Sequence, residues 1–246
     1  MKRAAGMTLL ETMMAVTLLS VLSVAMMLAM RLGVAALQRT DQRLMDNRRV
    51  AGAQRIVEQE LEGLMPVTAP CLGAGGEGGP KVPMFSGQTT SLTLISTFSL
   101  LHAWRGRPQV LQFFTRPSEN GGVSLVVNEL PYTGPKFVGS ICTGIQQSQE
   151  APGNFGQFLA PAAGPTTFVV ADRLRSVGFQ YLRRPEKEKG EEAAGVWLPA
   201  WQRPDWPAGI RIVMEPLEVT AARLQPVTIT APVYVYRTPG VEYADR

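Results

Sequence analysis

The hydrophobic and polar positions divide the chain into a helical front and a strand-rich back. Positions 12–30 are 19 consecutive residues without a charge. Further along, apolar residues recur near helical spacing with polar residues between them: Leu37, Leu44, Ala51, Ile56, Val57, Leu61 and Leu64. No proline precedes Pro66, so the pattern predicts one helix over residues 7–65, about 88 Å long if it is uninterrupted.

Segments after residue 90 have the apolar alternation or the short apolar runs of strands. The expected strands are residues 91–100, 110–115, 123–130, 136–141, 166–171, 174–183, 209–217 and 227–237. The run Asn120-Gly121-Gly122 predicts a turn and therefore a hairpin between the second and third of these strands. In the sixth strand the expected inward residues are Leu174, Val177, Phe179 and Tyr181. Because helical patterns do not alternate with the strands, we expect an α+β fold, with the long helix packed on a mainly antiparallel sheet.

A glycine-rich segment separates the helix from the strands. Residues 73–80 match a dinucleotide-binding G-x-G-x-x-G by letter. Their context argues against that function, because no strand precedes them and Pro80 stands where a helix should begin. We therefore interpret residues 66–81 as a Gly/Pro linker.

Composition removes several classes of function. One histidine, His102, and two cysteines are too few for a four-ligand nitrogen/sulfur zinc site within one chain. No nucleophile motif surrounds His102, and no phosphate loop is present, so we expect neither catalysis nor a cofactor. The carboxylates Glu186, Glu188, Glu191 and Glu192 lack calcium-loop spacing, and we read residues 186–192 as a solvated loop. The net charge of +4 comes from scattered basic residues, which argues against a nucleic-acid partner.

The uncharged run has the length of a membrane span. A helix needs about 20 apolar residues to cross the hydrocarbon layer, which is more than the apolar core of an ordinary secretory signal. Lys2 and Arg3 precede the run, so the positive-inside tendency places the N-terminus in the cytoplasm. Arg31 follows the run and can extend its charge toward the interface.

Glu11 interrupts the apolar pattern at the front of the span. A carboxylate in hydrocarbon costs several kcal/mol unless it is paired or neutralised, so an intramembrane acid indicates a function. Lys2 and Arg3 are its nearest basic residues. The alternative is that Glu11 simply lies in the headgroup layer, and position alone leaves both interpretations open.

The run Gly6-Met7-Thr8-Leu9-Leu10-Glu11, between a short basic leader and an apolar stretch, resembles the class III signal of type IV pilins and type II secretion pseudopilins. The resemblance implies that prepilin peptidase cuts after Gly6 and that Met7 becomes the N-methylated terminus. It also implies that Glu11 pairs with the terminal amine of a neighbouring subunit during assembly. The usual residue after the cut is phenylalanine, and methionine is a tolerated variant.

A second resemblance covers about 40 residues of the back half. The strand Leu174-Arg175-Ser176-Val177-Gly178-Phe179-Gln180-Tyr181-Leu182 is followed by Trp197 and Trp201, and then by Trp206-Pro207-Ala208-Gly209-Ile210-Arg211-Ile212. This order is similar to the J-type minor pseudopilins, although that family usually has leucine where Trp206 stands. We interpret the three tryptophans as packing across a loop rather than as a ligand-binding patch. An exposed subset would contact partner pseudopilins.

These resemblances imply a chain organised as a leader (1–6), a transmembrane half-helix (7–33), an amphipathic half-helix (34–65), the linker (66–81) and a periplasmic β-rich pseudopilin domain (82–246). The protein would be a single-pass protein of the bacterial inner membrane. Its partners would be prepilin peptidase and other pseudopilins, contacted through the N-terminal helices. Cys71 and Cys142 fall in the part expected in the periplasm, where a disulfide between them is plausible; the sequence leaves their pairing open.

Three functions compete at this point. The leading hypothesis is a non-enzymatic minor pseudopilin that helps to start or cap the pseudopilus of a type II secretion system. A minor pilin of a type IV pilus has the same N-terminal pattern, and only the tryptophan pattern argues for the former. The third is a membrane-anchored periplasmic enzyme or binding domain, for which Ser23-Val24-Ala25 would be a conventional cleavage site.

Overall fold

The structure of the protein is a computed structural model, and it describes residues 8–74, 79–99, 105–119, 121–184, 195–217 and 226–234. The chain forms two compact units, Met1–Arg49 and Val50–Arg246. The first unit consists of the front part of one helix. The second contains the end of that helix and all the strands.

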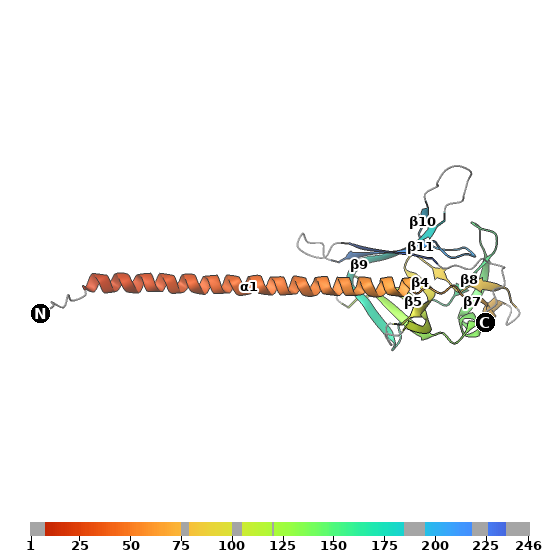
Figure 1. Ribbon diagram of the computed structural model, residues 1–246, viewed down its shortest axis with the longest axis horizontal. Helices are drawn as coiled ribbons and strands as arrows, with labels where there is room; N and C mark the ends of the chain where they lie inside the picture. Colours follow the sequence, from red (N-terminus) through yellow and green to blue (C-terminus); the bar gives the residue numbers. More distant parts are fainter. Residues whose placement is uncertain are drawn as a thin grey trace. The chain divides into compact units, whose positions relative to one another are not determined.

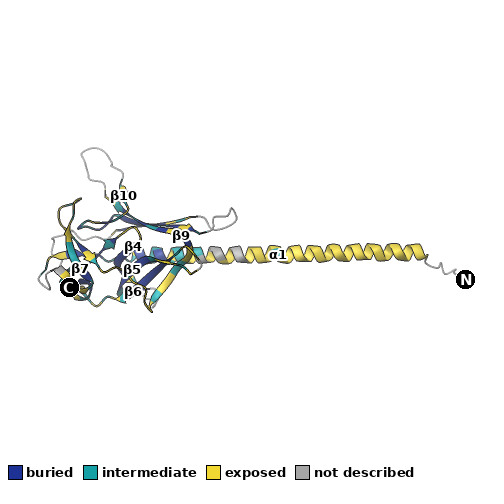
Figure 2. Ribbon diagram, turned by 180° about the vertical axis from the view of Figure 1, so that it is seen from behind, coloured by how far each residue is buried: buried dark blue, intermediate teal, exposed yellow. Residues whose placement is uncertain are grey.

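Helix α1 (Leu9–Glu62) is continuous, which confirms the predicted long helix within these bounds. Its first 41 residues lie in the first unit, and every described side chain over residues 8–34 is exposed (Figure 2). Over Leu9–Asp41 the helix is long and apolar enough to cross a membrane, and an 18-residue window within it has a mean hydropathy of 2.2. Such a surface is unusual for a helix in water, because an amphipathic helix presents a polar face to solvent.

The last turns of α1 belong to the second unit and are buried there. Val57 and Leu61 are at most 1% exposed, one helical turn apart on the same face. Beyond Glu62 the chain changes to extended backbone, and the Met65 N–H donates to the Ile95 carbonyl at 2.7 Å. The helix therefore ends before Pro66, where the chain begins to pair with the sheet.

The main sheet has eight antiparallel strands (Figure 1). In spatial order they are β12 (Val227–Pro232), β11 (Gly209–Pro216), β9 (Thr167–Arg183), β6 (Val123–Pro131), β5 (Arg105–Pro117), β4 (Ser91–Phe98) and β3 (Ser86–Gly87), while β10 (Val196–Leu198) also pairs with β9. The predicted α+β class and antiparallel sheet are thus present, and β5 and β6 form the expected hairpin.

Two strand predictions need correction. Residues 136–141 are not a strand, since Pro135–Ser140 forms the short helix α2. Pro135 is at its first turn, where a fixed φ favours the helix and the missing N–H costs nothing. The strands expected at residues 166–171 and 174–183 are one strand, β9. It continues through Arg173, which has a left-handed conformation (φ 55°). There β9 changes partner from β6 to β11.

A smaller layer, which the sequence pattern did not predict, covers the other face of the sheet. It contains the pair β1 (Thr68–Pro70) and β2 (Lys81–Pro83), the 3-10 turn η1 (Leu72–Ala74) and the pair β7 (Cys142–Gln147) and β8 (Asn154–Phe158). The segment assigned to a linker, 66–81, therefore includes residues that are paired and buried. Residues 75–78 of this segment lie outside the described part.

The core has two parts, one on each side of the sheet. Leu92 and Leu94 of β4 pack with Val57 and Leu61 of α1 in the larger part. Ile95 of the same strand packs with Cys71, Cys142 and Val138 in the smaller part. Both faces of β4 are therefore buried, as expected for a strand between two layers. The four predicted inward residues of β9, from Leu174 to Tyr181, are all buried.

Candidate functional site

Glu11 lies in the first turn of α1, three residues after Thr8. The Glu11 N–H donates to the Thr8 carbonyl at 3.0 Å and lies 3.4 Å from the Thr8 hydroxyl oxygen. Thr8 and Glu11 have the spacing of a capping box, in which a threonine caps the helix and an acid occupies its third position. A negative charge there also interacts favourably with the positive end of the helix dipole. The carboxylate is thus placed at the helix start by local interactions, and its side chain is exposed.

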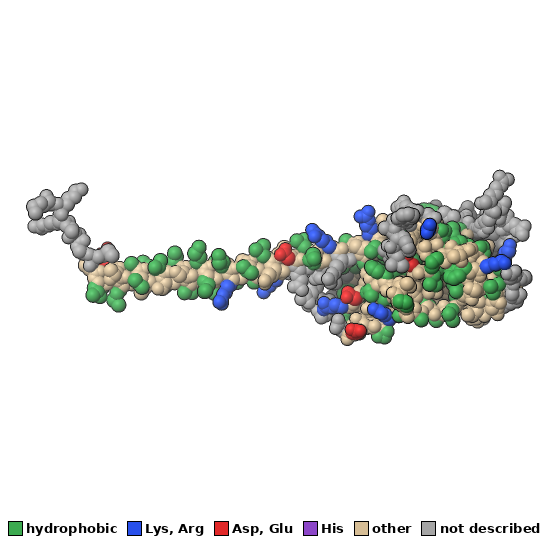
Figure 3. Space-filling model, turned by 90° about the horizontal axis from the view of Figure 1, so that it is seen from below, with side chains coloured by type: hydrophobic (Ala, Val, Ile, Leu, Met, Phe, Trp, Pro, Cys, Tyr) green, Lys and Arg blue, Asp and Glu red, His purple; other side chains and the backbone are tan. Residues whose placement is uncertain are grey.

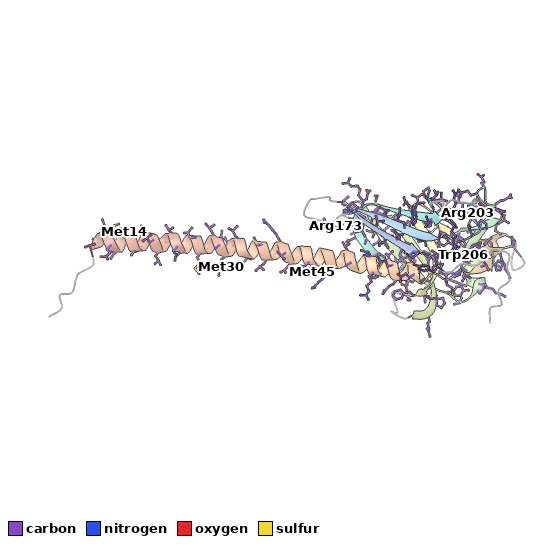
Figure 4. All side chains as sticks on the ribbon, turned by 45° about the horizontal axis from the view of Figure 1, so that its top comes forward. Met14, Met30, Met45, Arg173, Arg203 and Trp206 are labelled. Carbon is purple, nitrogen blue, oxygen red and sulfur yellow. A yellow bond between two sulfur atoms is a disulfide. The ribbon has the colours of Figure 1, made fainter. Side chains whose placement is uncertain are left out.

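Between Glu11 and Met30 the helix carries exposed apolar side chains, and Figure 3 shows such side chains along its visible face. Figure 4 labels Met14, Met30 and Met45, whose side chains stand out from the helix. Its hydroxyl groups bond back to helix carbonyls, as the Thr17 hydroxyl does to Met14 at 2.9 Å and the Ser20 hydroxyl to Val16 at 2.7 Å. Polar side chains satisfied in this way can be accommodated in hydrocarbon. In the first turns of the helix, Glu11 instead carries a charge.

Gly6 and Met7, the residues of the expected cleavage and methylation, lie outside the described residues. The same holds for His102 and for the carboxylates Glu186, Glu188, Glu191 and Glu192. Among the residues that the structure does describe, no group of three or more His, Cys, Asp or Glu side chains is arranged to hold a metal ion.

Cys71 and Cys142 form a disulfide, with their Cα atoms 5.2 Å apart. Cys71 follows β1, and Cys142 is the first residue of β7. Both are at most 1% exposed, in the smaller part of the core. The bond therefore links the chain just after α1 to the β7–β8 hairpin, across 71 positions of sequence.

Two of the three tryptophans are buried, as the packing interpretation predicts. Trp201 and Trp206 are 3% and 4% exposed and belong to the larger part of the core. The Trp201 indole N–H donates to the Asp205 carbonyl at 2.7 Å, and the Arg203 guanidinium lies 5.5 Å from its ring centroid. Figure 4 labels Arg203 and Trp206 in this loop.

Trp197 is only half-buried, on β10. The guanidinium of Arg211, on β11, lies 3.9 Å from its ring centroid. Arg211 also lies within 3.5 Å of Gln180 on β9 and Thr230 on β12. Stacked tryptophan and arginine side chains are the types that most often dominate protein interfaces. Of the three tryptophans, Trp197 is therefore the one that keeps exposed surface.

A buried carboxyl group at the end of α1 was missed by the sequence analysis. Glu60 has no exposed surface, and neither of its carboxyl oxygens has a hydrogen-bond partner among the described residues. Burial, and to a smaller extent the nearby Glu129 carboxyl on β6, together raise the pKa of Glu60 from 4.5 to about 9. Ser99, just after β4, donates to Glu129 at 2.7 Å.

The helical period contains the signal for this group. Glu60 lies three residues after Val57 and four before Leu64, both of which are buried. That spacing places all three on one face of the helix. The neighbouring acids Glu58 and Glu62 are not on this face, and both are more exposed.

Comparison with known proteins gave no relatives: no family model matches the chain, and no curated protein matches it.

Proposed function

We propose that this protein is a minor pseudopilin of a type II secretion system, a non-enzymatic subunit that helps to start or cap the periplasmic pseudopilus. The observation that carries the proposal is the position of Glu11. It is the one acid in the first turns of a continuous helix that is otherwise apolar as far as Met30.

An acid in that position needs a partner once the helix lies in a membrane. Removal of residues 1–6 would create a positive terminal amine at Met7, four residues from Glu11. In a bundle of such helices, the amine of one subunit and the carboxylate of the next would satisfy each other in a medium of low dielectric constant. Removing one partner of such a pair typically costs about 3–5 kcal/mol, which is enough to select correctly assembled subunits.

The rest of the chain supports a role outside the cytoplasm. The basic residues Lys2 and Arg3 favour a cytoplasmic N-terminus, which would place the sheet body in the periplasm of an inner-membrane protein. The Cys71–Cys142 disulfide fits that oxidising compartment. The start of α1 and the sheet body fit a subunit that its neighbours hold through α1. Prepilin peptidase would be the enzyme that processes it.

The first test is the N-terminus of the membrane form from the native host. Mass spectrometry of the N-terminal peptide should show a chain that begins at N-methylated Met7. A chain that begins at Met1 would contradict processing by prepilin peptidase. A chain that begins at Met26 would instead show conventional signal cleavage after Ala25 and would exclude the assembly role.

The second test separates assembly from membrane insertion. Glu11→Gln keeps the size of the side chain and removes its charge, and its effect on the helix start should be only about 0.3–1 kcal/mol. We expect normal membrane insertion and lost cross-linking to other pseudopilins. Asp41→Asn removes an exposed acid further along the same helix and is the matched control. Normal incorporation of Glu11→Gln into the pseudopilus would refute the role assigned to Glu11.

A further inference from the structure

A groove of about 430 Å³ lies beside β3, β4 and β8. Its walls come from both layers of the body, since β3 and β4 belong to the main sheet and β8 to the smaller layer. Among the residues that the structure describes, no Asp, Glu, Lys, Arg or His side chain lines it. Four hydroxyl side chains and four glutamines do, the latter being Gln88, Gln146, Gln157 and Gln202.

The glutamine amides that line the groove have hydrogen-bonding capacity to spare. Within the described part of the chain, none of the four makes a side-chain hydrogen bond, and all four are exposed. Each amide offers two donors and one acceptor oxygen, and each hydroxyl offers one donor and an acceptor. The groove thus concentrates neutral amide donors and acceptors that are not used within the described part of the body, whereas the Thr143 hydroxyl already donates to the Gln157 carbonyl at 3.2 Å.

Aromatic side chains complete the lining. Phe155 and Phe158, both on β8, are half-buried and line the groove. Trp201 also lines it but is not available for stacking, because it is buried and Arg203 already lies against its ring. Binding sites commonly combine such apolar surface with a few polar groups that fix orientation.

We propose that this groove binds a neutral oligosaccharide. A sugar ring has hydroxyl groups at its rim that match the amides and hydroxyls, and apolar C–H faces that match Phe155 and Phe158. The described lining residues are all uncharged, whereas phosphate and carboxylate ligands are usually recognised by charge-assisted bonds. The inference goes beyond the assembly role, since it concerns the body and not α1.

The geometry favours a sugar over a peptide. A peptide strand that adds to a sheet needs an unpaired strand edge. At β3, that edge is already occupied, because the Trp201 N–H donates to the Gly87 carbonyl at 2.8 Å and the two residues form a bridge. At β3, a ligand would therefore be bound through side chains of the groove rather than by strand addition.

The test is saturation-transfer NMR on the full-length protein with two neutral probes, cellotetraose and tetra-N-acetylchitotetraose. The protein is kept in lauryldimethylamine oxide micelles, because the headgroup of a maltoside detergent is itself a neutral sugar. We expect saturation transfer to at least one probe at millimolar concentration. Gln146→Ala and Gln202→Ala should each weaken its affinity about threefold to tenfold, the effect of one lost hydrogen bond.

Gln147→Ala is the matched control, because Gln147 is the exposed neighbour of Gln146 on β7 but does not line the groove. It should leave the affinity unchanged. Three results would overturn the proposal: no transfer to either sugar, equal weakening by Gln146→Ala and Gln147→Ala, or transfer only to an uncharged Gly-Ser-Thr peptide. Circular dichroism on each variant checks that the body remains folded.

Discussion

Replacing Glu60 by glutamine should make the body less sensitive to alkaline pH. The carboxyl has no exposed surface and no hydrogen-bond partner, and Glu129 is the charged group that faces it. Glutamine has nearly the same shape but cannot ionise. The substitution therefore removes one titration from the folded state and leaves the packing of α1 on β4 almost unchanged.

The size of the effect follows from the two pKa values of Glu60, 4.5 in the unfolded chain and about 9 in the folded one. Between these values the folded state holds a proton that the unfolded state has released. Stability therefore falls as pH rises, by about 1.4 kcal/mol per pH unit, and the loss begins near the lower value. From pH 5 to pH 8 the wild type should lose about 4 kcal/mol that Glu60→Gln retains.

The assay is urea denaturation of full-length protein in micelles, followed by the fluorescence of the buried tryptophans Trp201 and Trp206. The slope of unfolding free energy against pH is compared between wild type and Glu60→Gln. The slope is used because the buried amide of the variant shifts the unfolding free energy itself at every pH. Glu62→Gln changes an exposed acid two residues further on and should leave the slope as in wild type. A difference between wild type and Glu60→Gln that stays constant from pH 5 to pH 8 would refute the reasoning.

Two further predictions concern the stability of the body. Replacing Cys71 and Cys142 together by alanine should cost about 4 kcal/mol, because the bond closes a loop of roughly 70 residues, and the loss is measured by denaturation with and without reductant. Gly87→Ala should cost about 1–3 kcal/mol, because an added Cβ would lie 2.5 Å from the Tyr181 ring. Gly178→Ala, where nothing lies within 4 Å, is its control in thermal unfolding. Equal melting temperatures for the two glycine variants would contradict the close contact.

The long helix α1 and the β5–β6 hairpin could be predicted from the sequence. The absence of proline before Pro66 and the uncharged run correctly indicated one continuous helix. The Gly-rich turn near Gly121 correctly indicated the β5–β6 hairpin. Each of these signals lies within the segment that forms the element, so it does not depend on contacts with distant parts of the chain. Expectations that depend on other proteins, above all the roles of Gly6, Met7 and Glu11, stay predictions.

The short elements were missed because distant contacts determine them. β7 and β8 are rich in glycine and glutamine and have little strand pattern of their own, and the disulfide from Cys71 joins their hairpin to the end of β1. A strand was predicted at residues 136–141 because its apolar residues suit either structure, and Pro135 decided in favour of helix. The groove glutamines come from separate strands and loops, so no sequence spacing brings them together.

The way in which α1 is joined to the sheet also determines how the body would resist a pulling force on the helix. Tension on the helix reaches the body first at the last turns of α1, where Val57 and Leu61 are buried. It then reaches residues 63–65, which are held to β4 by the Met65–Ile95 and Thr97–Gly63 backbone hydrogen bonds. If these contacts break, residues 66–71, which include the β1 side of the β1–β2 pairing, can be drawn out before the Cys71–Cys142 bond stops the chain. The fully extended length of these residues is about 20 Å. The body thus resists first through reversible noncovalent contacts and then through one covalent bond.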